Sequence, residues 1–259
     1  MISVTLMGRL GNNLFQMAAA MALADIHKTK SVRTNTFEYL NALDLKDISH
    51  EQANTHSVFS EKKFNFNEQF LNLSDGTHLN GYFQSYRYFE KISDKIKDNF
   101  RFKQFVVDNV NYNGHEYLHD TNNNITGIHI RRTDYLNIQH AHPVCSLDYY
   151  ETCLGKINNN DRVLVFSDDL VWCRNTFTHP RYVIIDLDMH CSLYMMTKVK
   201  NLIMANSSFS WWGGWLNTHP NKTIFAPKQW FGDTLPYRNA DGDLSNCIKD
   251  LFPKEWNVV

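Results

Sequence analysis

The chain has 259 residues, of which 43% are hydrophobic, 26 are basic and 27 are acidic, as in a folded protein with a sizeable core. A net charge of −1 excludes the bulk positive charge with which nucleic-acid-binding proteins attract phosphates, so any anionic ligand must meet a few placed residues. No stretch reaches about 18 apolar residues, so we expect no transmembrane segment, while peripheral membrane contact stays open.

The N-terminal part of the chain predicts a strand, a turn and a helix. Ile2–Met7 is apolar, Gly8–Asn13 is rich in turn formers, and Leu14–His27 is rich in Ala, Met and Leu. This order opens a nucleotide-type α/β unit. Residues 28–77 are polar and give weak signals. The next predicted elements are a strand at Leu79–Gln84 and a helix at Tyr86–Asn99.

The Asn-rich segment Asn109–Asn124 is the predicted junction between two domains, 1–120 and 121–259. After it the pattern alternates between strand and helix. The predicted strands are Ile125–Ile130, Arg162–Phe166, Tyr182–Ile185, Leu202–Ala205 and Thr223–Ala226. The predicted helices are Leu147–Ile157, one from about Asp169, Cys191–Val199 and Phe209–Leu216. Such alternation indicates a parallel sheet covered by helices, whose ligands bind at the carboxyl ends of the strands.

Polar, glycine and charged residues gather at these predicted strand ends. The four segments are Gly8–Asn12, His129–Asp134, Ser167–Asp169 and Asn206–Ser210. Arg131 and Arg132 point roughly to opposite sides of their strand, so one can face a ligand while the other braces the scaffold. Arginine offers a fork that matches phosphate oxygens. The alternative is a structural salt bridge of the pair with Asp134 and a neighbour.

The segment Asn206–Ser210 precedes a predicted helix. Hydroxyls and free backbone N–H groups at a helix start form a ready anion site, and the alternative is simple N-capping by one serine. Gly8 and Gly11 are a weaker signal, although small residues let the backbone approach a ligand closely. Tryptophans are more often core residues than sugar platforms, which applies to the three that follow, Trp211, Trp212 and Trp215.

Cysteines and histidines show no zinc-binding spacing. The five cysteines are odd in number and contain no C-x-x-C pair, which favours free thiols and a cytoplasmic location. His140 and His142 form the closest histidine pair, and a loop is the better interpretation than a metal site. D-x-D tripeptides begin at Asp186 and Asp241, but this tripeptide is so common that chance or helix capping explains it better than a metal.

Several stretches together resemble the inverting α-1,2-fucosyltransferases of glycosyltransferase family 11. They run in order over about residues 1–231 and comprise Gly8–Gln16, Gly81–Ser85 with Tyr88 and Phe89, His129–Tyr135, Phe166–Asp169 with Trp172 and Cys173, and Ala205–Gly213. The H-x-R-R-x-D element is shared with wider fucosyltransferases, whereas the run at Ala205–Gly213 is more specific. The resemblance implies an α/β, GT-B-like fold of two Rossmann-type domains with a cleft between them, the N-terminal one on the acceptor side and the C-terminal one on the donor side.

The resemblance also implies a reaction and its residues. It implies transfer of L-fucose from GDP-fucose to a galactose hydroxyl of a glycan acceptor, in α-1,2 linkage, with no metal or other cofactor. Arg131 would bind the β-phosphate and stabilise the departing GDP, and Asp134 would act as a base or only hold an arginine. Asn12 is the third catalytic candidate, and the resemblance implies that it lies near donor and acceptor. The other candidates for donor binding are Gly11, His129, Asp168, Asp188, Ser207, Ser208 and Phe209.

The chain departs from the family pattern at several positions. Arg9 stands where the family often has Gly, and Asn13 where Gln is usual. Ser192 stands where an acidic residue usually begins the helix, and Asp188, one helical turn earlier, is the available substitute. This departure concerns guanosine recognition and donor identity. Two alternatives therefore stay open, namely a fucosyltransferase of another linkage and a non-catalytic sugar-nucleotide or glycan-binding protein on the same fold.

Overall fold

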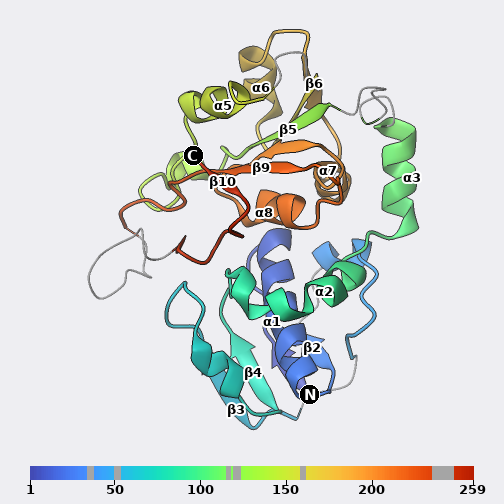
Figure 1. Ribbon diagram of the computed structural model, residues 1–259, viewed down its shortest axis with the longest axis vertical. Helices are drawn as coiled ribbons and strands as arrows, with labels where there is room; N and C mark the ends of the chain where they lie inside the picture. Colours follow the sequence, from blue (N-terminus) through green and yellow to red (C-terminus); the bar gives the residue numbers. More distant parts are fainter. Residues whose placement is uncertain (34–37, 50–53, 115–117, 119–123, 158–161, 235–247) are drawn as a thin grey trace. The chain divides into compact units, whose positions relative to one another are not determined.

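The computed structural model describes residues 1–33, 38–49, 54–114, 118, 124–157, 162–234 and 248–259 (Figure 1). The chain forms two compact units. Unit 1 comprises Met1–Lys103 and Pro236–Pro253, and unit 2 comprises Gln104–Leu235 and Lys254–Val259. The unit boundary thus lies N-terminal to the predicted one at residue 120, and the chain returns to unit 1 near its C-terminus.

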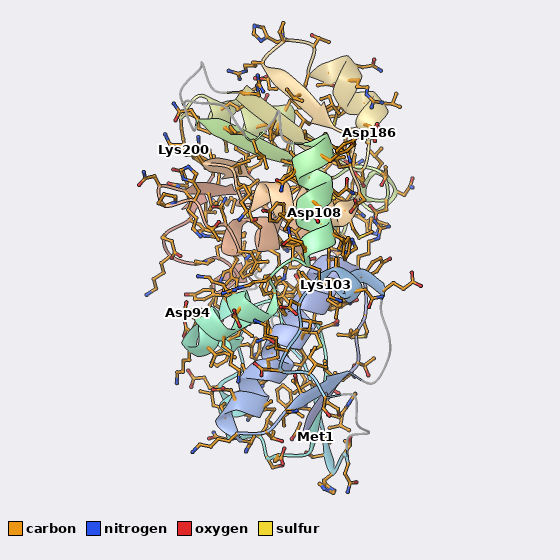
Figure 2. The ribbon with its side chains drawn as sticks, turned by 90° about the vertical axis from the view of Figure 1, so that its right-hand side faces the viewer. Met1, Asp94, Lys103, Asp108, Asp186 and Lys200 are labelled. Atoms are coloured by element: carbon orange, nitrogen blue, oxygen red, sulfur yellow. The ribbon has the colours of Figure 1, made fainter. Side chains whose placement is uncertain are left out.

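Helix α3 (Gln104–Asn113) explains the difference at the boundary. The Asn-rich sequence predicts a junction here, but Val106 and Val110 lie one helical turn apart and are both buried, and α3 packs against α7 (Met189–Met196) of unit 2. Asp108 lies on the exposed side of the same helix (Figure 2). A short apolar stripe therefore outweighs the turn-like composition.

Unit 1 contains a four-stranded sheet in the order β2-β1-β4-β3, with all neighbouring strands parallel. The strands are β1 (Ile2–Val4), β2 (Ser31–Arg33), β3 (Ser57–Ser60) and β4 (Thr77–Asn80). The helical elements are α1 (Leu10–Ile26), η1 (Glu38–Ala42), η2 (Glu68–Asn72), η3 (Tyr86–Tyr88), η4 (Glu90–Ile92) and α2 (Ser93–Asn99). The single helix predicted at 86–99 is wrong, because Phe89 and Ile92 have non-helical backbone angles and divide it into three.

Helix α1 begins four residues before its predicted start. Gly8 has a φ of +76°, which makes the turn after β1, and Arg9 is already the N-cap. Gly11 and Asn12, predicted to lie in a loop, therefore lie in the first turn of α1. The Ala, Met and Leu side chains that follow are almost all buried, so α1 is a core helix that packs on β1 and β2.

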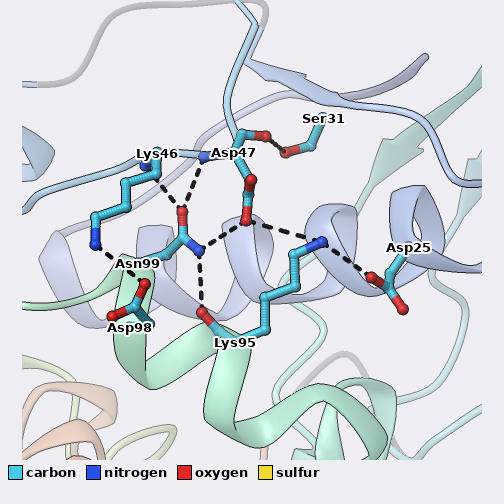
Figure 3. Close-up of polar contacts among 7 residues, drawn as sticks. All are labelled: Asp25, Ser31, Lys46, Asp47, Lys95, Asp98 and Asn99. Carbon is cyan, nitrogen blue, oxygen red and sulfur yellow. Dashed lines mark hydrogen bonds and ion pairs between the residues drawn. The ribbon is translucent and has the colours of Figure 1, made fainter.

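A buried amide connects α2 to the rest of unit 1 (Figure 3). Asn99 is 1% exposed, and its Oδ1 accepts hydrogen bonds from the backbone N–H groups of Lys46 and Asp47, both at 2.9 Å. Its Nδ2 donates to Asp47 Oδ2 at 2.9 Å and to the Lys95 carbonyl at 3.0 Å. Lys95 in turn pairs with Asp25 of α1 at 2.9 Å. These residues, the Asn99 hub, join α1 and α2 to the segment Lys46–Asp47, which follows η1, and every polar group of the Asn99 amide is used.

Unit 2 contains a six-stranded parallel sheet in the order β10-β9-β8-β5-β6-β7. The strands are β5 (Ile125–Ile130), β6 (Arg162–Ser167), β7 (Tyr182–Ile185), β8 (Asn201–Ile203), β9 (Thr223–Ala226) and β10 (Asn257–Val258). The helices are η5 (Tyr135–Asn137), α5 (Leu147–Leu154), α6 (Leu170–Thr176), α7 (Met189–Met196) and α8 (Ser208–Trp215). The predicted alternation of strand and helix is confirmed here, and β10 is an addition.

Strand order in unit 2 reverses between β5 and β8. From β5 the chain adds β6 and β7 on one side, then returns to add β8, β9 and β10 on the other. Right-handed crossovers then require α5 and α6 on one face and α7 and α8 on the opposite face, as Figure 1 shows. In open sheets of this kind, ligands bind outside the carboxyl ends of the strands at the point of reversal.

The two faces of this sheet have separate cores. Ile128 and Ile130 pack with Tyr150 of α5 on one face. On the other face, a Cβ at Gly127 would lie 3.2 Å from the Leu202 side chain, so the glycine allows close packing there. Trp211, Trp212 and Trp215 are at most 8% exposed and pack on one another and on Trp256, so the prediction that they are core residues is confirmed. Among the described residues, no helix has the length and apolarity needed to cross a membrane.

Candidate functional site

The candidate residues of unit 2 lie at the carboxyl ends of neighbouring strands. Arg131 directly follows β5, and Asn206 and Ser207 come soon after β8, which pairs with β5 at the reversal of strand order. Asp168 follows β6, the other neighbour of β5. The prediction that these strand-end segments come together is thus confirmed within unit 2. We call His129, Arg131, Asp134 and Asp168 the Arg131 cluster.

Two carboxylates hold the guanidinium of Arg131. Its Nη2 lies 2.6 and 2.7 Å from the two oxygens of Asp134, and its Nη1 lies 3.1 Å from Asp168 Oδ2. The guanidinium also lies 5.3 Å from the centre of the Tyr135 ring. These are the contacts of the salt-bridge alternative. Because a guanidinium has five N–H donors, they leave it capacity for a further acceptor such as a phosphate oxygen.

Arg132 is the bracing member of the arginine pair. Its Nε lies 3.2 Å from Asp169 Oδ2, and its guanidinium stacks 4.0 Å from the centre of the Trp172 ring. Asp169 also caps α6 by accepting a hydrogen bond from the Trp172 backbone at 3.1 Å. The side chain of Arg132 is therefore fixed to the start of α6, as expected for one arginine of the pair.

Asp168 is the fixed anion of the cluster. It accepts hydrogen bonds from the Arg132 backbone N–H, at 2.9 Å, and from the Thr133 hydroxyl. Burial by itself would raise the pKa of Asp168, but the hydrogen bonds from Thr133 and Arg132 and the charge of Arg131 outweigh it and hold that pKa below its usual value. Asp168 is therefore ionised near neutral pH and orients Arg131, while its predicted contact with a donor stays a prediction.

His129 is a buried side chain with an unsatisfied atom. The residue is 5% exposed, and its Nδ1 has no hydrogen-bond partner among the residues that the structure describes. Burial, assisted by the charge of Arg131 and opposed by Asp168, lowers the pKa of His129 to about 3, so the ring is neutral at pH 7. The ring lies 5.5 Å from that of Phe209 at the start of α8. Buried polar atoms usually have partners, so this nitrogen marks a place for a ligand or water.

The start of α8 shows the capping interaction that was the alternative to an anion site. Ser207 is the N-cap and accepts a hydrogen bond from the Phe209 backbone at 3.3 Å, and Ser208 is the first helical residue. The hydroxyl of Ser210 lies 3.3 Å from the backbone carbonyls of Ala205 and Ser207, which precede the helix, and donates to them. The cap satisfies the backbone N–H of Phe209, one of the N–H groups at this helix start.

Asn206 is a positioning residue that the sequence-based site candidates missed. Its Nδ2 donates to the carbonyls of Pro143 at 2.8 Å and Trp230 at 3.0 Å, and its own carbonyl accepts from the Tyr135 hydroxyl at 3.1 Å. The Cys145 thiol lies 3.5 Å from its Oδ1. Asn206 therefore joins the loops that follow β5, β8 and β9. The run Ala205–Gly213 contained it, but nothing in the local sequence indicates these distant partners.

Asp188 is not brought into the Arg131 cluster. It caps α7 by accepting hydrogen bonds from the backbones of His190 at 2.8 Å and Cys191 at 3.1 Å. Although burial opposes it, these bonds lower the pKa of Asp188. Its helix follows β7, the edge strand, two strands from β5. Because Asp188 is a helix cap, the capping interpretation of the D-x-D tripeptide at 186–188 is confirmed. Asp186, the first residue of that tripeptide, pairs with Arg174 at 2.7 Å. The tripeptide at 241–243 lies outside the described residues.

The candidates of unit 1 fasten the ends of β1 and β4. Asn12 Oδ1 accepts a hydrogen bond from Gln84 Nε2 at 2.8 Å. Gln16 accepts from the Met7 backbone at 2.9 Å and donates to the Gly81 carbonyl at 3.0 Å. Gly11 lies beside Asn12 in the first turn of α1. The N-terminal motif therefore holds the reversal point of the smaller sheet, between β1 and β4.

Comparison with known proteins gives one matching family model and several similar proteins. The model of Glycosyl transferase family 11 matches residues 1–256. One similar protein is the Escherichia coli O-antigen biosynthesis glycosyltransferase WbnK, 34% identical over 174 residues, or 62% of this chain and 57% of that protein. Another is an E. coli alpha-1,2-colitosyltransferase, 33% identical over 165 residues, or 58% and 55% of the two chains. The matches thus span little more than half the length of these relatives.

Two solved structures share the fold. POFUT1 in complex with GDP-fucose has a TM-score of 0.53 and 12% identity, covering 86% of this chain and 96% of that one. The fucosyltransferase NodZ from Bradyrhizobium has a TM-score of 0.55 and 12% identity, covering 82% and 91%. At this identity the likeness concerns the fold alone. It confirms the predicted GT-B-like class with two Rossmann-type units, and the cleft between them stays a prediction.

Proposed function

The chain belongs to glycosyltransferase family 11, and we propose that it transfers L-fucose from GDP-fucose to a galactose hydroxyl of a glycan acceptor. The proposed linkage is α-1,2, formed with inversion at the anomeric carbon and without a metal ion. One observation carries the proposal. Arg131 is held by Asp134 and Asp168 at the reversal of the larger sheet, and its charge acts on His129, whose buried Nδ1 has no partner within the described part of the chain.

The chemistry of the leaving group suits this cluster. As the bond between C1 of fucose and the β-phosphate oxygen breaks, negative charge develops on GDP and positive charge on the sugar ring. A preorganised guanidinium and the N–H groups at the start of α8 would stabilise that negative charge in place of a metal. Ser207, Ser208 and Phe209 are the proposed contacts to the diphosphate and ribose, with His129 beside them.

Asp134 has two proposed roles that differ in where the acceptor proton goes. The acceptor oxygen forms its bond to C1 as GDP leaves, and its hydroxyl proton passes to a base or to solvent. Asp134 is 42% exposed in its side chain and can serve as that base. Its double contact with Arg131, at 2.6 and 2.7 Å, supports the orienting role more directly. We therefore assign orientation of Arg131 to Asp134 first.

A colitosyl donor is the second candidate. One relative, 33% identical, is an alpha-1,2-colitosyltransferase, and colitose differs from fucose in lacking the 3-hydroxyl. Ser192, which replaces the acidic residue usual in the family, leaves donor identity open. Its hydroxyl donates to the Leu187 carbonyl at 3.3 Å, and Asp188 acts as a helix cap. A fucosyltransferase of a different linkage and a non-catalytic binding protein on the same fold also stay open.

Donor, linkage and metal dependence can be tested together. The purified protein is incubated with GDP-fucose or GDP-colitose and a panel of galactosides, with and without EDTA, while GDP release is followed. We expect fucose transfer that EDTA does not reduce, and an α-1,2 product by NMR. Exclusive use of GDP-colitose would favour the second candidate. Tight GDP binding without transfer to any acceptor would favour a binding protein, and loss of activity in EDTA would contradict the metal-free mechanism.

A cytoplasmic location is part of the proposal. The described cysteines, Cys145, Cys153, Cys173 and Cys191, are all free thiols, which a reducing compartment maintains. Burial raises the pKa of each of these thiols, so they are protonated and poorly reactive at neutral pH. Cell fractionation with an antibody against the protein would test the location directly.

A further inference from the structure

The loop Gly81–Gln84, which follows β4 in unit 1, has an unusual backbone. Phe83 has a φ of +53°, in the left-handed region that residues other than glycine rarely adopt. Its side chain is fully buried and packs on the rings of Phe59, at 6.4 Å between centroids, and Tyr88, at 5.4 Å. Such strain persists only where the surroundings enforce it, and it concentrates at functional sites.

A single carboxylate holds this backbone from one side. Glu61 lies directly after β3, and its Oε2 accepts a hydrogen bond from the Tyr82 backbone at 2.8 Å. Both of its oxygens lie 3.1 Å from the Phe83 backbone nitrogen. A Cβ at Gly81 would come within 2.4 Å of the Glu61 side chain, so the close approach requires glycine. Among the described residues, no cation forms an ion pair with Glu61.

The other side of the same loop is bound to α1. Gln16 donates to the Gly81 carbonyl at 3.0 Å, and Gln84, the last residue of the loop, donates to Asn12 Oδ1 at 2.8 Å. The ends of β1, β4 and β3, which are neighbours in the sheet, are thereby linked. Glu61 is thus connected to Asn12, a proposed catalytic residue, through the Gly81–Gln84 loop, in which Phe83 has the left-handed φ.

The surroundings of Glu61 make its charge depend on pH near neutrality. Burial raises the pKa of Glu61 to about 7, the hydrogen bonds from Phe83 and Tyr82 lower it, and the negative charge of Asp250 raises it. Tyr88, whose phenol accepts a hydrogen bond from the Asn67 backbone, also feels the Glu61 charge. Burying a carboxylate near another anion, with two N–H donors but no paired cation among the described residues, costs free energy. A purely structural role does not explain that cost.

We propose that Glu61 is a positioning residue of the transfer reaction, fixing the Gly81–Gln84 loop and, through Gln84, the side chain of Asn12 for the glycan acceptor. The inference rests on the proposed function, in which Asn12 lies near donor and acceptor. Protonation of Glu61 places a proton against two N–H donors and loosens the loop. Acceptor use therefore weakens as the pH falls through the Glu61 titration, whereas GDP binding by unit 2 does not change.

The direct test is Glu61→Gln, which keeps the shape of the side chain and removes its charge. We expect kcat/KM for the acceptor at saturating donor to fall about 10- to 100-fold, mainly through KM, as for a misplaced substrate-positioning group. The wild-type loss of activity below about pH 7 should disappear in this variant. Calorimetric GDP affinity should stay at the wild-type value. Glu61→Asp, which keeps the charge, should retain part of the activity and the acid limb.

Two further variants separate positioning from a general effect of charge or folding. Glu68→Gln removes the same charge from an exposed residue of η2 and should leave all parameters unchanged. Gln84→Ala removes the hydrogen bond to Asn12. It should therefore lower kcat/KM for the acceptor as Glu61→Gln does, and it should abolish the loss of activity at low pH. The double variant with Glu61→Gln should be little worse than either single variant, because both break one chain of contacts. If Glu61→Gln fails to fold, Gln84→Ala alone carries the test.

The outcomes distinguish this inference from the proposed function. If the wild type transfers sugar and Glu61→Gln keeps its acceptor kinetics and pH profile, the inference is wrong and the proposed function stands. Equal losses of GDP and acceptor affinity, or additive effects of Glu61→Gln and Gln84→Ala, would also overturn it. If the wild type transfers no sugar from either donor to any galactoside, the proposed function fails and the inference fails with it.

Discussion

The Asn99 hub of unit 1 and the Arg131 cluster of unit 2 are both networks of buried or partly buried polar groups, but they differ in how completely those groups are satisfied. Both acceptor sites of the Asn99 oxygen and both N–H groups of its nitrogen are used within the protein (Figure 3). In the Arg131 cluster, the buried Nδ1 of His129 has no partner among the described residues, and Arg131 is paired with Asp134, whose side chain is 42% exposed.

This difference separates structural from binding polar groups. A buried network that satisfies every member stabilises one conformation, and nothing in it can be offered to a ligand without loss. A network with an open atom and an exchangeable partner is less favourable by itself but can bind. The comparison predicts stability effects from changes in the Asn99 hub and activity effects from changes in the Arg131 cluster.

Arg131→Ala should have the largest effect. It removes the group proposed to stabilise departing GDP, so we expect kcat to fall about 10²- to 10³-fold, as for other preorganised charge-stabilising donors. The far-UV circular dichroism spectrum should not change. Arg131→Lys keeps the positive charge but lacks the planar fork of a guanidinium, so its kcat should lie between those of the wild type and Arg131→Ala.

The matched control for Arg131 is Arg174→Ala. Arg174 is in the same unit, and its guanidinium pairs with Asp186 at 2.7 Å, but both side chains are more than half exposed. Its loss removes the same charge from a surface pair that contributes little. Near-normal turnover in Arg131→Ala, or an equal loss in both variants, would remove Arg131 from the mechanism.

Asn99→Ala should have the next largest effect, on stability. It removes four hydrogen bonds and leaves the Lys46 and Asp47 N–H groups without acceptors, so we expect the free energy of unfolding to fall by about 3 kcal/mol. Urea unfolding followed by tryptophan fluorescence and circular dichroism measures it. Asn113→Ala, at an exposed position of α3, is the control and should change little. A loss of GDP affinity in folded Asn99→Ala, without loss of stability, would contradict the comparison.

The fold of unit 2 was largely predictable, and that of unit 1 was not. The strands β5, β7 and β9 have the bounds read from sequence, because each is a short apolar run between turn-forming residues. In unit 1, β2 and β3 are short, lie in the polar region 28–77 and owe their pairing to β1 and β4. Non-local pairing leaves no periodicity in the local sequence, which is also why β10 was missed.

The site follows the same rule. Arg131 and Asp134 are three residues apart, and strand-end logic brings Asp168 to them, so this part could be predicted. The bonds of Asn206 to Pro143 and Trp230 cross 63 and 24 residues of sequence. Partners at such distances leave no local pattern. Sequence therefore indicates which residues carry the chemistry better than it indicates which residues position them.

His129→Gln should have an intermediate effect. We expect GDP affinity to fall about tenfold, the typical result of losing one buried hydrogen bond to a ligand. Stability should respond to pH. Because the folded pKa of His129 is about 3 and the unfolded value is about 6.5, the neutral ring favours the folded state above pH 6.5, and this contribution is lost as the pH falls toward 3. Urea titrations between pH 4 and 7 should show a weaker acid loss in the variant.

Glu61 gives the internal control for that measurement, because its pKa shifts in the opposite direction. Its folded pKa of about 7 is raised, so its contribution is present at low pH and is lost as the pH rises toward 7. Glu61→Gln should therefore steepen the acid loss of stability that His129→Gln flattens. If His129→Gln leaves both GDP affinity and stability at low pH unchanged, the Nδ1 of His129 has no role in binding. The comparison of the Asn99 hub with the Arg131 cluster would then be wrong for His129.

The smallest effects should come from Asp188, where the comparison meets its most demanding case. Asp188→Ala removes a helix N-cap and should lower the free energy of unfolding by about 1 kcal/mol, whereas Asp188→Ser keeps a capping hydroxyl and should lower it by much less. If Asp188 is only a cap, both variants bind GDP as the wild type does. Weaker GDP binding in stable Asp188→Ser would mean that this carboxylate replaces the acid that Ser192 lacks. A capping carboxylate that already accepts hydrogen bonds from the protein would then also bind a ligand. Complete hydrogen bonding within the protein would therefore no longer separate structural polar groups from binding ones.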